Sequence, residues 1–190
     1  ALYDLLVKKQ DFRTAITYHR KLGAKPEEPY FSLVVDQLAF AHFSLNEIPQ
    51  ALKLLESELT HIPETEAMST PEVMEREKVF GNIALYMFTA IDRKLPGYST
   101  AGYLPYVLKL KPGVTLGRAL TLFANLIRSR GWDSELQAFQ TQVLAAKISP
   151  AAQADVLLTS FESQIGKRRW ADVRSSAQIL VQLGTRALAA

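Results

Sequence analysis

The chain has no cysteine and only three histidines, which argues against several kinds of site at once. Without cysteine there is no disulfide framework, no cysteine-ligated zinc and no cysteine nucleophile. His19, His42 and His61 do not have the spacing of a His-Glu-x-x-His motif or of another metal site. His42 lies on the apolar face of a predicted helix, and we interpret it as a core histidine. No phosphate-binding loop or Gly-x-Ser-x-Gly motif occurs, so we expect neither catalysis, nor a metal, nor a cofactor.

Long hydrophobic runs are also scarce. The longest strongly apolar run, residues 83–91, has nine residues, whereas a membrane-spanning helix needs about 20. We therefore expect no transmembrane segment. The chain opens without an initiator methionine and without the pattern of a signal peptide, so we interpret it as part of a longer chain. Because cysteine is absent we expect a cytoplasmic location, although exported bacterial proteins also commonly lack cysteine.

Strand patterns are nearly absent, and helix patterns dominate. The nearest approach to a strand is 106–113, where three apolar residues share one face before a Pro-Gly turn. In 35–45 and 50–59, apolar residues recur at three- and four-residue spacings, as on one face of an α-helix. Between these two segments Asn46 is a candidate helix cap, and Pro49 suits a first turn. The pattern predicts two antiparallel helices.

Further helix starts are predicted where a capping residue precedes a proline. Residues 69–72 read Ser-Thr-Pro-Glu, and residues 147–153 show the same pattern, with Ser149 before Pro150. Proline is tolerated in the first helical turn because its missing N–H would be unpaired there in any case. Both segments are therefore predicted to open helices, and the chain is predicted to be all-α.

One pattern recurs along the chain. Ala15 and Ala51 hold the same place in two copies and lie 36 residues apart, and Leu136 and Val173 lie 37 apart in two others. The segments that share the pattern are 9–22, 38–63, 131–144 and 167–180. Periods of 20–50 residues indicate stacked units of secondary structure, which bind other chains more often than they catalyse reactions.

The spacing is broken in the middle of the chain. Ala51 and Leu136 are 85 residues apart, although two further repeats would take about 70. The surplus lies around 95–113, which contains three prolines and three glycines. Because proline interrupts helical hydrogen bonding, we predict that 95–113 is not a regular helix. Either it replaces the second helix of the third pair, or it is an inserted loop.

The repeats resemble the tetratricopeptide repeat (TPR), a 34-residue pair of antiparallel helices. The second copy carries the pattern with Leu38-Ala39, Ala51, Leu55, Leu59 and Pro63. The other copies match at Phe12, Ala15, Ile83, Ala84, Ala124, Gly131, Leu136, Val143, Trp170 and Val173. This resemblance implies one all-α domain over 1–190, an α-solenoid of about five antiparallel helix pairs with an irregular inserted loop at 95–113.

In the TPR family, the first helices of successive pairs line a concave groove that binds an extended peptide or a partner helix. The register implied by the resemblance places these residues there: Leu33, Asp36, Phe40, Phe43, Lys78, Leu85, Phe88, Arg118, Thr121, Asn125 and Arg128. The arginines and asparagine resemble groove residues that hold carboxylates in some family members, but the acidic and apolar remainder does not complete such a clamp. Phe40 and Phe43 either form a recognition patch or pack on a neighbouring pair or on 95–113.

Charge is distributed unevenly. Residues 1–95 carry 11 basic and 14 acidic side chains, and residues 96–190 carry 11 and 5. A basic half can attract an acidic partner, but we interpret these charges as solvated outer faces. Residues 128–132 and 167–170 mix arginine with tryptophan, a combination that can bind nucleic acid. Because both tryptophans fall near the same point of a repeat, we interpret them as core residues and do not expect nucleic acid as the partner.

These observations lead to one functional hypothesis and two alternatives. The TPR resemblance implies a non-catalytic scaffold or adaptor, a subunit of a multiprotein assembly that binds a protein partner in its groove. The first alternative is an RNA-binding helical repeat that depends on Arg128 and the basic residues 167–169. The second is a regulatory domain of a larger enzyme. The oligomeric state stays open.

Overall fold

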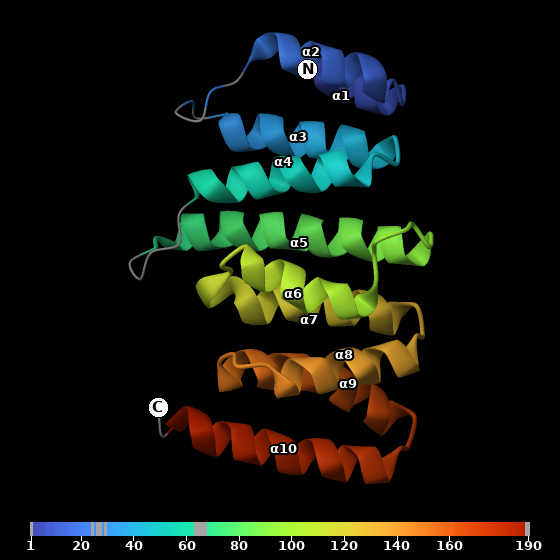
Figure 1. Ribbon diagram of the computed structural model, residues 1–190, viewed down its shortest axis with the longest axis vertical. Helices are drawn as coiled ribbons and strands as arrows, with labels where there is room; N and C mark the ends of the chain where they lie inside the picture. Colours follow the sequence, from blue (N-terminus) through green and yellow to red (C-terminus); the bar gives the residue numbers. More distant parts are fainter. Residues whose placement is uncertain (1, 24, 26–27, 29, 63–67, 189–190) are drawn as a thin grey trace. The chain divides into compact units, whose positions relative to one another are not determined.

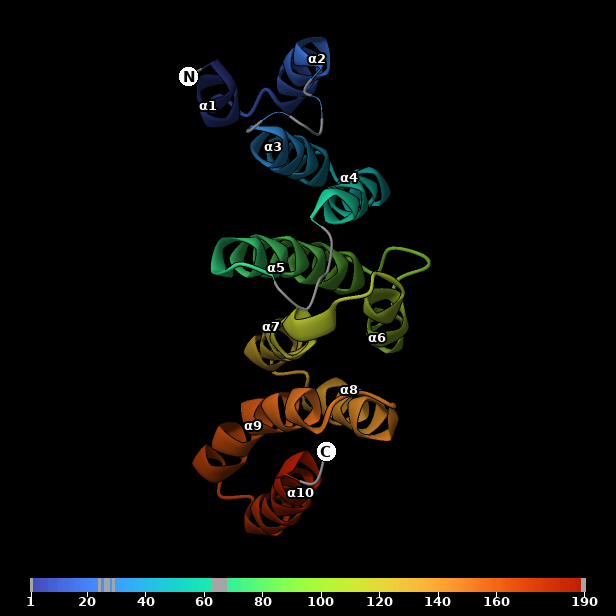
Figure 2. The same ribbon diagram turned by 90° about the vertical axis from the view of Figure 1, so that its left-hand side faces the viewer.

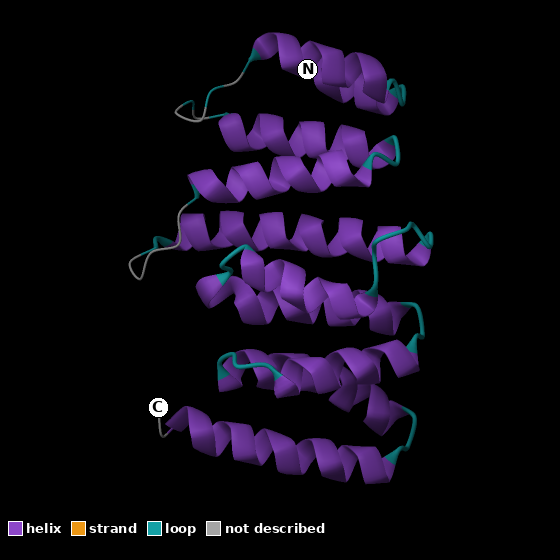
Figure 3. Ribbon diagram, viewed as in Figure 1, coloured by secondary structure: helices purple, strands orange, loops and turns teal. Residues whose placement is uncertain are grey.

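The computed structural model describes residues 2–23, 25, 28, 30–62 and 68–188. Over these residues the regular structure consists of ten α-helices and one 3-10 helix, without a strand (Figure 3). In chain order they are α1 (Leu2–Lys8), α2 (Phe12–Leu22), α3 (Phe31–Ser44), α4 (Ile48–His61), α5 (Thr70–Asp92), α6 (Thr100–Lys109), η1 (Gly113–Thr115), α7 (Leu116–Ser129), α8 (Asp133–Ala145), α9 (Pro150–Gly166) and α10 (Trp170–Leu188). The all-α prediction is thereby confirmed.

The chain forms two compact units, Ala1–Ala90 and Ile91–Ala190. In the first unit α1 packs against α2, α2 against α3, and α3 against α4. Figure 1 shows α3 and α4 side by side and running in opposite directions. Small side chains permit this approach, since Ala15, Ala39 and Ala51 have no exposed surface. A larger residue at Ala51 would overpack the α3–α4 pair, at a cost of about 1–3 kcal/mol.

The turn between α3 and α4 differs from the prediction. Pro49 lies in the first turn of α4, as expected, but Glu47 and not Asn46 occupies the cap position. Asn46 instead has a φ of 63°, in the left-handed region that asparagine tolerates better than most residues. Across this turn the His42 ring and the Glu47 carboxylate lie 2.6 Å apart. His42 is buried, so its interpretation as a core histidine is confirmed.

Both helix starts predicted from a serine before proline are confirmed. At α5, the Glu72 carboxylate accepts from the N–H of Ser69 at 2.8 Å and from its hydroxyl at 2.6 Å. At α9, the Ser149 hydroxyl oxygen accepts from the N–H of Ala152 at 3.2 Å. These bonds pair N–H groups that a helix start leaves without an internal partner. Pro63, expected to close α4, lies outside the described residues.

The second unit has two layers of helices. Helix α6 packs on α8 in one layer, α7 packs on α9 in the other, and α10 packs along α9 (Figure 2). A buried aromatic cluster joins three of them: Tyr103 of α6 stacks on Phe123 of α7 at 3.7 Å between centroids, and Phe123 meets Phe139 of α8 edge-on at 5.2 Å. The Tyr103 hydroxyl donates to the carbonyl of Ala119 at 3.0 Å. This cluster is the core on which the second unit is built.

The predicted irregular loop at 95–113 is wrong in its central part, because Thr100–Lys109 form α6. Pro105 lies inside this helix and has no N–H to donate to the carbonyl of Ala101, four residues earlier. The side-chain amide of Gln142 on α8 donates to that carbonyl instead, at 2.9 Å. The tertiary hydrogen bond compensates for the proline. The segment is thus a short helix between two turns.

Candidate functional site

Four of the residues that the resemblance assigns to a groove lie on α3. Leu33 and Phe40 are 55% and 41% exposed, and their spacing of two turns places them on one face of the helix. The Phe40 ring meets the Phe12 ring edge-on at 6.1 Å between centroids. Phe43 is half-buried and stacks on Tyr86 of α5, with centroids 4.2 Å apart and planes 12° from parallel. Phe40 therefore belongs to the surface, and Phe43 to the contact between α3 and α5.

Asp36, the fourth residue on α3, is buried and binds two side chains of α5. Lys78 donates to one oxygen of its carboxylate, and Asn82 donates to the other at 3.2 Å. Lys78, Asn82 and Leu85 follow one face of α5 at spacings of four and three residues. Leu85 is 40% exposed. We call Leu33, Asp36, Phe40, Lys78, Asn82 and Leu85 together the α3–α5 surface.

Phe88 is the one predicted residue of α5 that faces inward. It is 7% exposed and belongs to the core of the first unit, so it offers a partner almost no surface. The helical period explains this, because Phe88 lies on the face of α5 that also carries Ala84 and Met87, both buried.

Sequence reasoning missed Glu58, a fully buried carboxyl group on α4 beside this surface. Neither of its oxygens makes a hydrogen bond of normal geometry within the described part of the chain. Burial raises the pKa of Glu58 to about 8, and the negative charge of Asp36 adds to the rise, while Lys78 and Ser32 act in the opposite direction. A signal was present in the sequence, since Glu58 falls three residues after Leu55 on the apolar face of α4.

Lys78 supplies the positive charge of this acidic cluster. Burial acts to lower the pKa of Lys78, but its hydrogen bond to Asp36 and the charges of Asp36 and Glu58 outweigh that effect and raise it. The side chain of Lys78 is 57% exposed and that of Asp36 is 10% exposed. The ammonium group thus covers a buried carboxylate at the edge of the α3–α5 surface, where it is accessible to a partner.

The remaining predicted residues lie on α7, in the second unit. Arg118 is exposed, and Thr121, Asn125 and Arg128 are half-buried. Arg128 donates to the carbonyl of Thr159 on α9 at 2.9 Å, a contact that joins α7 to α9. The predicted groove residues are therefore divided between the two units, and those on α7 belong to the second unit.

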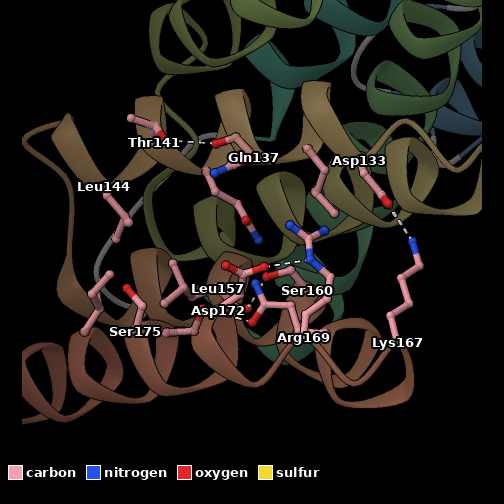
Figure 4. A pocket seen from close by; sticks show the side chains of 15 residues that line it. Asp133, Gln137, Thr141, Leu144, Leu157, Ser160, Lys167, Arg169, Asp172 and Ser175 are labelled. Carbon is pink, nitrogen blue, oxygen red and sulfur yellow. Dashed lines mark hydrogen bonds and ion pairs between the residues drawn. The ribbon is translucent and has the colours of Figure 1, made fainter.

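A second candidate site, not foreseen from the sequence, is a cleft in the second unit. Helices α8 and α10 form its walls and α9 its floor, as the labelled side chains of Figure 4 show. One hollow of about 250 Å³ is lined by Asp133, Leu136, Gln137, Gln140, Thr141, Leu144, Leu157, Ser160, Gln164, Lys167, Arg169, Asp172, Ser175, Ser176 and Ile179. A second hollow of about 220 Å³ shares Leu144 and Ile179 with it and adds Gln153, Gln182, Leu183 and Arg186. We call the two together the α8–α10 cleft.

Ion pairs neutralise one end of this cleft. Lys167 donates to Asp133 at 2.7 and 2.8 Å, and Arg169 lies 2.6 Å from Asp172. The charge of Lys167 lowers the pKa of Asp133, mainly through this hydrogen bond. Two cations of the predicted RNA-binding cluster are thus paired with carboxylates of the chain.

The two tryptophans flank the same end of the cleft. Trp132 precedes Asp133 and is half-buried, whereas Trp170 follows Arg169 and is 63% exposed. The interpretation of both as core residues is therefore wrong for Trp170. Trp170 is the first residue of α10, directly after Arg169 of the cleft lining, and its exposed ring is a natural fluorescence reporter.

Comparison with protein-family models, with curated proteins and with solved structures found no match for this chain. In the part of the chain that the structure describes, no helix is long and apolar enough to cross a membrane. Among the same residues, no group of three or more histidine, aspartate or glutamate side chains has the arrangement of a metal site.

Proposed function

We propose that the chain is a non-catalytic protein-interaction module, built as a degenerate TPR-like solenoid, that serves as an adaptor subunit of a larger assembly. Its partner segment docks on the α3–α5 surface. The observation that carries this proposal is the exposure of Leu33, Phe40 and Leu85 on two helices that are joined at Asp36. Large apolar side chains exposed together on adjoining elements are typical of binding surfaces.

Burial of the small residues supports the TPR-like architecture. The positions that the repeat pattern reserves for small side chains are fully buried, at Ala15, Ala39, Ala51, Ala84 and Ala124. Ten α-helices follow one another along the described residues, which is the number that five helix pairs require. Small residues at these points allow close approach of paired helices, which is what a stacked helix-pair array requires.

The surface combines affinity and orientation in the way that interfaces commonly do. Leu33 and Phe40 supply apolar anchors about 10 Å apart along α3. Between them, the Asp36–Lys78 pair offers an ammonium group that can reach a partner carboxylate without leaving Asp36 unpaired, because an ammonium has three donors. A partner segment with two apolar side chains flanking an acidic residue fits this arrangement.

Substitution of both anchors tests the proposal. The variant Leu33→Ser/Phe40→Ser should lose its partner in affinity purification of the full-length protein, while its helical circular dichroism stays at the wild-type level. Val114→Ser removes an apolar side chain that is 71% exposed in the second unit and serves as the matched control. Retention of the same partners by the double variant would refute the α3–α5 surface as the docking site.

A further inference from the structure

The α8–α10 cleft has the dimensions of a short polypeptide in extended conformation. Its lining runs from Asp133 to Leu144 on α8 and from Asp172 to Arg186 on α10. At 1.5 Å per helical residue these stretches are about 16 and 21 Å long. An extended chain rises about 3.3 Å per residue, so five or six residues span the cleft.

Neutral carboxamides are the most distinctive part of the lining. Five of the glutamines of the chain contribute to it: Gln137, Gln140, Gln153, Gln164 and Gln182. Three of these have structural partners, since Gln140 donates to Val156, Gln153 to the carbonyls at the end of α8, and Gln164 accepts from Ser176.

The other two carboxamides are free. Within the described residues, the side chains of Gln137 on α8 and Gln182 on α10 make no hydrogen bond to the rest of the chain, and both are exposed to solvent. Each carboxamide carries a carbonyl acceptor and two N–H donors, the same groups that a peptide backbone presents. The two walls of the cleft therefore each offer an unused amide to a ligand that lies between them.

We propose that the α8–α10 cleft binds an extended, uncharged stretch of polypeptide through hydrogen bonds from Gln137 and Gln182 to its backbone. This site is separate from the α3–α5 surface and does not depend on it. Leu144 and Ile179, which are both half-buried, provide apolar contact for side chains on one face of the bound stretch, because side chains of an extended chain alternate between two faces.

The chemistry of the lining selects an extended chain over a helix. The backbone groups of a helix are already paired within the helix, so a docked helix would cover Gln137 and Gln182 without satisfying them. An extended chain leaves its N–H and C=O groups available, and the carboxamides pair with them. The charges at one end of the cleft are balanced by the Lys167–Asp133 and Arg169–Asp172 pairs, so that end requires no charge on the bound stretch.

Selection from random ten-residue peptides, displayed on phage and panned on the wild-type chain, supplies the probe. Binding of each selected peptide is then measured by tryptophan fluorescence and by isothermal titration against three variants. Gln137→Met/Gln182→Met removes the amides and keeps side-chain length. Gln50→Met/Gln178→Met makes the same change at two exposed glutamines outside the cleft and is the matched control. Leu33→Ser/Phe40→Ser reports on the α3–α5 surface.

The expected result is a class of peptides whose affinity falls at least tenfold in the Gln137→Met/Gln182→Met variant and is unchanged in the other two. Their affinity should change less than threefold between 50 and 300 mM salt. Methylation of a central backbone nitrogen of the peptide should weaken binding about tenfold, because it removes a donor. Because the substituted side chains are at exposed positions, the circular dichroism spectra of all three variants should be identical.

Three outcomes would overturn the proposal. The first is a selection in which no peptide depends on Gln137 and Gln182. The second is tighter binding when helix-favouring α-aminoisobutyric acid replaces a central peptide residue, which would indicate a helical ligand. The third is a steep salt dependence together with competition by single-stranded RNA, which would indicate phosphate recognition. Peptides sensitive only to Leu33→Ser/Phe40→Ser would support the α3–α5 surface and still overturn the cleft as a peptide site.

Discussion

The side chain of Gln142 on α8 supplies the hydrogen bond that Pro105 cannot make within α6. Its amide donates to the carbonyl of Ala101 at 2.9 Å, four residues before the proline. Through this bond a helix with an internal proline is held against its neighbour, and the second unit keeps a helix where the local sequence favours a loop.

We expect Gln142→Leu to lower the free energy of unfolding by about 1 kcal/mol, because it leaves the Ala101 carbonyl without this donor. The effect should nearly vanish in a Pro105→Ala background, where the restored N–H of residue 105 pairs with that carbonyl. Urea unfolding of the four proteins of this double-mutant cycle measures the coupling. Equal effects of Gln142→Leu in both backgrounds would show that the amide has another role.

Phe40 and Phe43 of α3 should differ in their contributions to stability. Phe43→Ala removes a ring stacked on Tyr86 and should cost about 2–3 kcal/mol. Phe40→Ala removes a ring that is 41% exposed and should cost less than about 1 kcal/mol. Chemical denaturation followed by circular dichroism measures both. Comparable losses would place Phe40 in the core and remove it as a binding residue.

Glu58 should make the protein less stable as the pH rises. Burial raises its pKa to about 8 in the folded chain, above the value of about 4.3 expected when unfolded. Between these values the folded state holds more protons than the unfolded state, so stability falls with increasing pH across this window. Glu58→Gln should therefore stabilise the protein by about 1–3 kcal/mol at pH 7, with little effect near pH 4.5.

Thermal unfolding of wild type and Glu58→Gln at pH 5, 6, 7 and 8 provides the measurement. The difference in melting temperature should grow steadily over this series. A constant difference would mean that Glu58 is already ionised in the folded state and that the buried carboxyl does not titrate in this range. Glu56→Gln on the same helix is the control.

Tyr103 should tolerate loss of its hydroxyl better than loss of its ring. Tyr103→Phe removes the hydrogen bond to the Ala119 carbonyl and should cost about 1 kcal/mol. Tyr103→Ala also empties the stack with Phe123 and should cost about 3–5 kcal/mol. Denaturant unfolding compares them. A similar cost for the two variants would mean that the hydroxyl, rather than aromatic packing, holds α6 to α7.

The sequence predicts those parts of the fold that depend on neighbouring residues. Three- and four-residue spacings indicated the helices of the second repeat, and the serine before proline located the starts of α5 and α9. Helix α6 escaped prediction because the donor that compensates for Pro105 comes from a residue 37 positions further along the chain. Local rules treat a proline as a break, and they contain no information on tertiary hydrogen bonds.

The candidate sites could likewise be predicted only in part. Helical period placed Leu33 and Phe40 on one face of α3, but it could not separate an exposed Leu85 from a buried Phe88 on α5. Exposure depends on which helices pack against each face, and that is a property of the tertiary structure. The α8–α10 cleft was beyond sequence reasoning because its lining comes from three helices whose spacing no local pattern encodes.

Site-specific photocrosslinking tests the central claim most directly. A photoreactive amino acid placed at Leu33 or at Leu85 in the full-length protein, in its native cells, should crosslink to one and the same partner polypeptide. The same group at exposed Lys53 on α4 should not, and Phe40→Ser should abolish the crosslinks from both positions. Crosslinks that form equally from Lys53, or that survive Phe40→Ser, would contradict docking on the α3–α5 surface.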